Sequence, residues 1–440
     1  MALAAKTGTI LHEWPERQVV FDSDGSRIPD KDVPEIAEGF WGIVADAFKY
    51  SAESTKTIPA SRSFMDFVRE QVAEKYQDET EEVATKKRVR ICREAEMWGA
   101  FVGSAVQRQS LRFFWLEECI EGENPFVAST YEKILREIAR PAEEGADLRL
   151  AHKVTDVKSQ ESGKVVVEVN GSKEEFDEVI VTSPLGWLQS NRHIFEPPLP
   201  SRLSDAIMNI SYGTLDKVYI TFETAFWETE GSKAGAAVGK EQAQAPNTTA
   251  TVAPHRQPSE QGQDEQDDEH YPGFTLFYGK EDYTKPNAGI HNAMNMAALP
   301  ASCAHPSLLF YIFGEASTEI AELVKKTAAS ALDGKLIQHF LPYFSLMPNY
   351  SAEDPKCQAK AAFATNWASD ELAGYGSYST FRTGLEKADE DIECMRHGMP
   401  ERHVWMAGEH TAPFDALGTV TGAYWSGEDV AKRIVAARGG

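Results

Sequence analysis

The sequence has few cysteines, and none of them lie at metal-ligand spacing. The five are an odd number, they are widely scattered and they form no C-x-x-C pair: Cys92, Cys119, Cys303, Cys357 and Cys394. This pattern indicates neither a disulfide framework nor a zinc site, so we predict no metal ligands. A reducing compartment suits such a chain.

Long apolar runs are missing as well. No stretch of about 18 apolar residues occurs, as a membrane-spanning helix would need. The opening "MALAAKTGTILHEWPERQ" is too short and too interrupted in its apolar part for a signal peptide. We therefore expect a soluble, cytoplasmic protein with no membrane partner.

Basic residues are scarce relative to acidic ones. The chain carries 44 Lys and Arg against 68 Asp and Glu, a formal net charge of -24. This excess repels nucleic acid and favours cationic ligands, so no nucleic-acid partner is predicted. The oligomeric state is left open.

The 440 residues include 42% hydrophobic and 25% charged side chains, which is typical of a globular protein with two or three domains. Spacings of three and four between apolar residues predict helices from about 33 to 118, after two extended segments within 8–29. Further strands and helices alternate to the end, so we expect a mixed α/β (α+β) fold. Residues 231–270 are poor in large apolar side chains and strongly acidic at their end, and we predict a disordered insertion there.

The most informative stretch lies near the C-terminus, "VWMAGEHTAPFDALGTVTGAYWSG" at 404–427. An apolar strand delivers Gly408 and Glu409 to its carboxyl end, where open α/β sheets bind ligands. A buried Glu409 needs hydroxyls or cations as partners, and an ion pair or a helix cap explains it as well as a ligand does. Gly418, Gly422 and Gly427 clear space at the start of the next helix, for an anion or for tight packing.

These residues carry a family resemblance. The closing stretch resembles the C-terminal flavin-binding motif of the flavin-containing amine oxidases, and three earlier segments agree in the same order. They are "NPFVASTYEKILREIA", "VIVTSPLGWLQSNRHIFEPPLPSRLSDAIMNISYGTLDKVYITFETAFW" and "NWASDELAGYGSYS". The middle one is most similar to fungal polyamine-oxidase-like members. The resemblance spans roughly residues 10 to 437.

The resemblance implies FAD as the cofactor and assigns residues to it. Gly408 and Glu409 would contact its ribityl and pyrophosphate part. Thr419 and Val420 would lie by the flavin pyrimidine, at the positive end of a helix. The backbone of Val154 would meet the adenine, and Trp367 would pack on the flavin.

The same resemblance implies the chemistry. Lys217 matches the lysine that holds a water near flavin N5, although a solvated lysine on an alternating strand is the plainer interpretation of that residue alone. Tyr378 or Phe414 would take the place of an aromatic that flanks the substrate, unless either is simply core. The reaction implied is hydride transfer from the α-carbon of an amine or polyamine to the flavin, followed by imine hydrolysis and reoxidation by O2 to H2O2.

One part of the family pattern is missing. Before residue 50 the glycines are Gly8, Gly25, Gly39 and Gly42, and they form no G-x-G-x-x-G. We therefore expect an incomplete Rossmann-type FAD-binding domain, and FAD binding by this chain stays open. Two alternatives remain: a non-catalytic remnant acting as a binding protein, and a lysine-specific histone demethylase-like enzyme, although the sequence shows no long antiparallel helical insertion.

The expected domain organisation follows the motifs. Residues 1–120 would form strands and helices of a substrate domain, and 121–190 part of the FAD-binding domain. Residues 191–356 would return to the substrate domain, and 357–440 would complete the FAD-binding domain.

Overall fold

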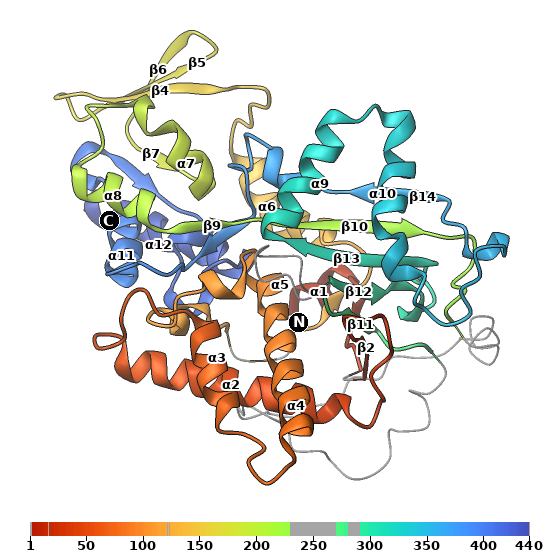
Figure 1. The fold of residues 1–440 in the computed structure, drawn as a ribbon. Helices are drawn as coiled ribbons and strands as arrows, with labels where there is room; N and C mark the ends of the chain where they lie inside the picture. Colours follow the sequence, from red (N-terminus) through yellow and green to blue (C-terminus); the bar gives the residue numbers. More distant parts are fainter. Residues whose placement is uncertain are drawn as a thin grey trace.

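A computed structural model describes residues 2–15, 17–120, 122, 124–228, 270–279 and 291–439 of the chain (Figure 1). Nearly all of the predicted disordered insertion, 231–269, lies outside the described residues. The elements alternate as expected, and the fold is mixed α/β with several sheets. None of the described helices is both long and apolar enough to cross a membrane.

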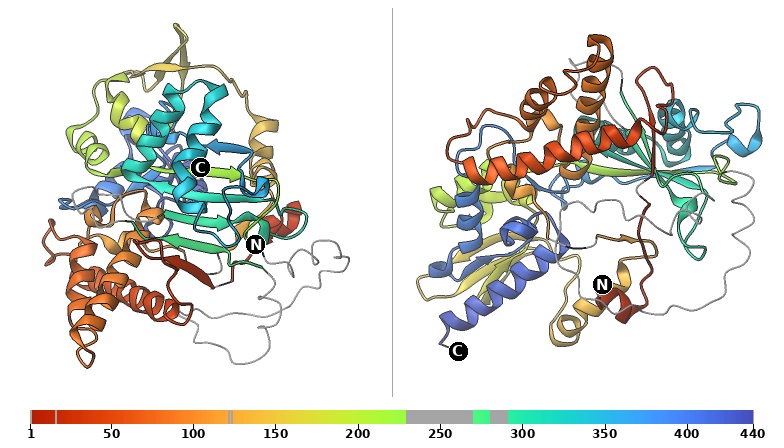
Figure 2. Two further views of the ribbon diagram at one scale, coloured as in Figure 1. Left: turned by 45° about the vertical axis from the view of Figure 1, so that its right-hand side comes forward. Right: turned by 90° about the horizontal axis from the view of Figure 1, so that it is seen from below.

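A six-stranded sheet forms the centre, in the order β14-β10-β13-β12-β11-β2. Neighbouring strands are antiparallel except β11 and β2, which run parallel. The strands are β2 (Gln18–Phe21), β10 (Leu215–Thr221), β11 (Phe274–Phe277), β12 (His291–Asn295), β13 (Ser307–Phe313) and β14 (Ala361–Ala364). Helices α9 (Gly314–Lys326) and α10 (Ala329–Phe344) cover one face (Figure 2).

The alternation in β10 explains how this sheet is oriented. Asp216, Val218 and Ile220 are fully buried, whereas the residues between them are only partly buried. Successive side chains of a strand point to opposite faces. Val218 and Ile220 join the core under α9 and α10, so Lys217 points to the other face.

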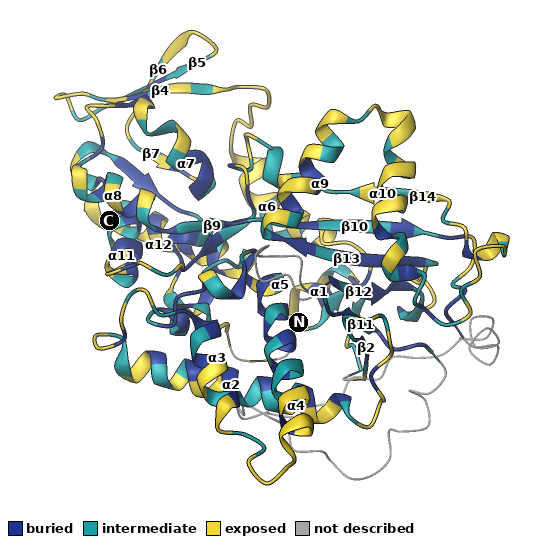
Figure 3. Ribbon diagram, viewed as in Figure 1, coloured by how far each residue is buried: buried dark blue, intermediate teal, exposed yellow. Residues whose placement is uncertain are grey.

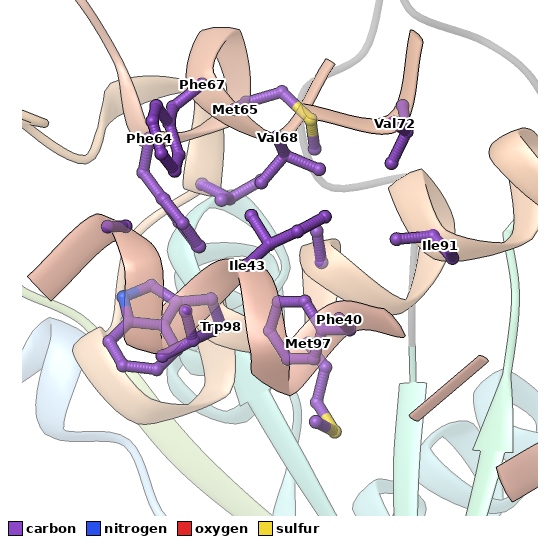
Figure 4. Close-up of a cluster of buried hydrophobic side chains, with 14 of the residues drawn as sticks. Phe40, Ile43, Phe64, Met65, Phe67, Val68, Val72, Ile91, Met97 and Trp98 are labelled. Carbon is purple, nitrogen blue, oxygen red and sulfur yellow. The ribbon is translucent and has the colours of Figure 1, made fainter. Parts of the chain in front are cut away.

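A helical layer forms a second core. It contains α2 (Val33–Ser54), α3 (Phe64–Ala73), α4 (Glu81–Ala95) and the short α5 (Gly99–Val102). Ser63 begins α3 with a capping box, in which its side chain accepts from the Asp66 N–H and Asp66 accepts from the Ser63 N–H. Apolar side chains from these helices and from the 3-10 turn Glu96–Trp98, among them Phe40, Phe64 and Trp98, point toward one another (Figure 4).

A third core joins segments from the middle and the end of the chain. Its sheet β6-β5-β4-β8 consists of β4 (Val154–Ser159), β5 (Val165–Val169), β6 (Ser172–Phe176) and β8 (Phe195–Glu196). Its helices are α7 (Leu185–Asn191), α8 (Ser201–Asn209) and α11 (Ala388–His397). Helix α12 (Val420–Ala437) packs through Val430 in a small separate cluster with Trp405 and Ala407. We call the part of the molecule built on this third core the C-terminal lobe. Figure 3 shows buried segments inside this lobe and exposed residues on its helices.

Two short strand pairs complete this lobe. Strand β7 (Val179–Val181) pairs in parallel with β16 (Val404–Met406), and β9 (Ser211–Gly213) pairs antiparallel with β15 (Tyr378–Thr380). Ile180 in β7 is 42% exposed. Among the described strands, β7 and β16 pair only with each other, so this parallel pair keeps open edges, where a sheet can accept another strand.

The N-terminal elements lie beside the central sheet. Helix α1 (Ala2–Thr7) contacts α6 (Glu132–Gly145), and β1 (Leu11–His12) pairs with β3 (Phe126–Val127). The two extended segments expected within 8–29 are thus present. The prediction that strand-like segments come first was wrong, because α1 precedes them.

Candidate active site

Strand β16 delivers Glu409 to the site, at the start of a 3-10 turn, Glu409–Thr411. The two carboxylate oxygens of Glu409 accept the N–H and the hydroxyl of Ser379 in β15, at 3.1 and 2.6 Å. Burial raises the pKa of Glu409 to about 7. The neighbouring His410 is buried and its pKa is lowered to about 4, so it is neutral at pH 7 and forms no ion pair. Glu409 therefore holds β15 against the C-terminal motif.

A second carboxyl, which the sequence analysis did not identify, holds the same strand. Glu117 accepts from the Gln109 amide, the Thr380 hydroxyl and the Phe381 N–H, at 2.9, 3.0 and 3.2 Å. All three bonds go to one oxygen, Oε1. Burial, with a smaller contribution from the charge of Glu409, raises the pKa of Glu117 to about 7. Glu117 stands among several acids, and nothing in its local pattern distinguishes it.

The aromatic candidates lie in different surroundings. Tyr378, in β15, donates its hydroxyl to the carbonyl of Phe101, and burial raises its pKa well above the usual range. Phe414 packs edge-on against Trp115, with ring centroids 5.4 Å apart, and the Arg396 guanidinium lies 5.0 Å from its centroid. These contacts place the Phe414 ring in the third core.

The start of α12 is open on one side. Thr419 caps the helix by accepting the Gly422 N–H at 2.9 Å, and Val420 is 58% exposed. The first amides of a helix have no partner within it, so this end offers donors and positive potential. The three glycines are not equivalent. A Cβ on Gly422 would lie 2.0 Å from the Ala416 carbonyl oxygen, Gly418 has a φ of +69° beside Tyr378, and Gly427 meets open space.

Lys217 and Trp367 are both held by hydrogen bonds at β10, Lys217 through Thr365 and Trp367 through Asp216. The Lys217 N–H donates to the Thr365 hydroxyl at 2.9 Å, and its Nζ lies 5.4 Å from the Tyr311 ring centroid. Burial lowers the pKa of Lys217. Trp367 begins a 3-10 turn, Trp367–Ser369, and remains 47% exposed. Its backbone N–H donates to the Asp216 carboxylate at 2.8 Å.

The segment before β15 connects these two groups. Ser377 donates its N–H to the Gly213 carbonyl and its hydroxyl to the Leu215 carbonyl, both at 2.8 Å. Leu215 is two residues before Lys217. The structure thus joins Lys217 and Trp367, by way of β15, to Glu409 and the start of α12.

Val154 lies apart from this connection. It begins β4 and packs against the third core, as Phe414 does. Its neighbour Lys153 pairs with Glu371, in the loop after Trp367, with Nζ 3.0 Å from the carboxylate. Within the described part of the chain, no cluster of His, Cys, Asp and Glu is suited to hold a metal ion.

Comparison with known proteins gives the class. The profile of the flavin containing amine oxidoreductase family matches residues 10–435. The chain belongs to this family. Among its relatives are "Probable polyamine oxidase 4" of Arabidopsis thaliana, 29% identical over 209 residues, and "Lysine-specific histone demethylase 1" of Caenorhabditis elegans, 26% identical over 301 residues.

These alignments cover parts of each protein. The first spans 47% of this chain and 40% of the plant relative, and the second spans 66% of this chain and 31% of the nematode relative. Two solved structures share the fold at 16% identity and a TM-score of 0.62. They are a cyclohexylamine oxidase from Brevibacterium oxydans, with 98% of this chain and 84% of the other covered, and a putrescine oxidase, with 99% and 85% covered.

The residues on the flavin side fit the cofactor that the family implies. Trp367 and Val420 are large apolar side chains that the protein leaves 47% and 58% exposed. A bound flavin would cover exposed apolar surface of this kind, and the open start of α12 would favour the negative charge of a reduced ring. Trp367, Thr419 and Val420 are the residues that, by the family resemblance, would hold the ring. FAD supplies redox chemistry that no side chain offers.

The two buried carboxyls predict an unusual pH dependence. Their pKa values of about 7 in the folded state exceed the ordinary 4.5, so the folded chain keeps protons that the unfolded chain releases between these values. The resulting stabilisation is complete below about pH 4.5 and is lost as the pH rises through 7. We expect each carboxyl to contribute roughly 2 kcal/mol to this loss, after discounting for partial exposure. Urea denaturation at pH 5.5 and 8 measures it.

The variant Glu117→Gln isolates one of the two. A glutamine oxygen in the place of Oε1 keeps all three hydrogen bonds but does not titrate. Glu117→Gln should therefore flatten the pH dependence, whereas the neighbouring Glu118→Gln, at an exposed position, should not. An unchanged slope in Glu117→Gln would contradict the assignment.

Proposed function

We propose that this chain is an FAD-dependent amine oxidase of the polyamine-oxidase type. The observation that carries the proposal is the exposure of two apolar side chains, Trp367 and Val420, the second of them in the first turn of α12. The family and the polyamine-oxidase relatives support it. Bound FAD would accept a hydride from the α-carbon of the amine, with the imine hydrolysed and the flavin reoxidised by O2 to H2O2.

The proposed site residues contact three partners: FAD, a water molecule and the substrate. Trp367, Thr419 and Val420 contact the flavin ring, while Gly408 and Glu409 serve the ribityl and pyrophosphate part. The backbone of Val154 serves the adenine. Lys217 holds a water at the reacting edge, where burial lowers its pKa and eases proton exchange with that water. Tyr378 and Phe414 are the proposed aromatic residues at the substrate.

The substrate class is an amine that reacts in its neutral form. The net charge of -24 attracts cationic amines to the surface of the chain. The demethylase relatives make a methylated lysine peptide a second class worth testing. The missing G-x-G-x-x-G motif and the cytoplasmic location stay predictions.

The first experiment asks whether the 440-residue chain takes up FAD. We expect a bound flavin spectrum in the visible range after addition of FAD and removal of the excess. We also expect peroxide on addition of spermine or an acetylated polyamine, measured with a coupled peroxidase assay. A methylated lysine peptide serves as the alternative substrate. A chain that stays colourless with excess FAD would support the non-catalytic binding protein instead.

The second experiment tests Lys217. Replacement of Lys217 by Met keeps the apolar stem and removes the amine, so anaerobic reduction or aerobic reoxidation of the flavin should slow by about tenfold or more. Stopped-flow absorbance measures both rates. Lys360→Met, at an exposed lysine next to β14, is the matched control and should leave both rates unchanged. Equal rates in wild type and Lys217→Met would remove Lys217 from the site.

A further inference from the structure

Asp216 is a buried carboxylate to which the proposed chemistry gives no task. It lies in β10 directly before Lys217 and is 0% exposed. Its Oδ1 accepts the Thr365 hydroxyl at 2.6 Å and the Trp367 N–H at 2.8 Å. Its Oδ2 accepts the Ser317 hydroxyl at 2.6 Å and the Ala368 N–H at 3.4 Å.

All four of these partners are neutral donors. A charge buried without a cation is costly, and several hydrogen bonds to the ionised form offset that cost. Those bonds do more than satisfy the carboxylate, because they come from three different elements. Ser317 belongs to α9, Thr365 follows β14, and Trp367 begins the 3-10 turn.

The two oxygens have different neighbours. Oδ1 holds the residues that lead to the site, since Thr365 also accepts the Lys217 N–H at 2.9 Å and returns its own N–H to the Lys217 carbonyl at 2.9 Å. Oδ2 mainly ties the sheet to α9 through Ser317. The Asp216 side chain lies on the opposite face of β10 from Lys217, so it cannot reach a substrate on the Lys217 side.

We propose that Asp216 is a positioning residue that fixes the exposed indole of Trp367 and the backbone of Lys217 relative to each other. It acts through Thr365 and the Trp367 N–H, and it touches neither cofactor nor substrate. The inference rests on the proposed function only for the roles of Trp367 at the flavin and of Lys217 at the water. The hydrogen bonds around Asp216 form in the chain without any ligand.

The test reads the environment of Trp367 directly. The 440-residue chain, with its nine tryptophans labelled as 5-fluorotryptophan, gives a fluorine NMR spectrum in which Trp367→Phe identifies the Trp367 signal. Asp216→Ala should shift or broaden that signal. Asp216→Asn should restore it, because the amide oxygen can replace Oδ1 and the amide N–H can donate to the Ser317 hydroxyl.

Three variants separate positioning from general stability. Thr365→Val removes a donor on the Oδ1 side and should move the Trp367 signal, whereas Ser317→Ala removes one on the Oδ2 side and should not. Asp391→Ala removes another buried aspartate, which Arg202 and Asn209 hold, and should lower the melting temperature without moving the signal.

The outcomes decide the proposal in each case. An unchanged Trp367 signal in Asp216→Ala, or an equal change in Asp391→Ala, would overturn it. If Asp216→Ala does not fold, Thr365→Val decides, and an unchanged signal there overturns the proposal.

A second readout is the FAD dissociation constant, which should rise about tenfold or more in Asp216→Ala and stay the same in Ser317→Ala. If the wild-type chain binds no FAD, the proposed function fails, and the fluorine signal still decides the role of Asp216.

Discussion

The hydrogen-bonded pair of Glu409 and Ser379 is the contact on which the site depends. It joins the C-terminal motif to β15, although the two residues are 30 positions apart in the chain. Through Ser377 the same segment is bonded to Leu215, and so to the strand that carries Lys217. This pair is the side-chain hydrogen bond that fastens the C-terminal motif to β15, next to the contact between Gly418 and Tyr378.

The contacts that hold β15 are made by carboxyl groups in buried positions, where a charge is costly. Glu409 accepts hydrogen bonds from Ser379 and Glu117 from Thr380, both in β15, and burial raises both pKa values to about 7. A carboxyl that is half protonated near neutral pH stabilises the fold less as the pH rises. Asp216 is a third buried acid, and four hydrogen-bond donors surround it. The three acids together hold β15, the C-terminal motif and the Trp367 turn.

Local sequence predicted the parts of the site but not the way they are joined. The strand, loop and helix of residues 404–437 followed from apolar periodicity and glycine spacing, and the structure confirmed them. The family resemblance is likewise confirmed. Glu117 was missed because its partner Thr380 is 263 residues away, and Asp216 because Thr365 is 149 residues away. Such contacts leave no local pattern, because only the folded chain brings the partners together.

The most direct test of this account is a double-mutant cycle on FAD binding. The dissociation constant is measured by flavin fluorescence for wild type, Ser379→Ala, Glu409→Ala and the double variant. If the pair assembles the site, each single variant weakens binding, and the double is little worse than either, with a coupling energy of about 1 kcal/mol or more. Losses that add to within about 0.3 kcal/mol would contradict the account, and so would a wild-type chain that binds no FAD.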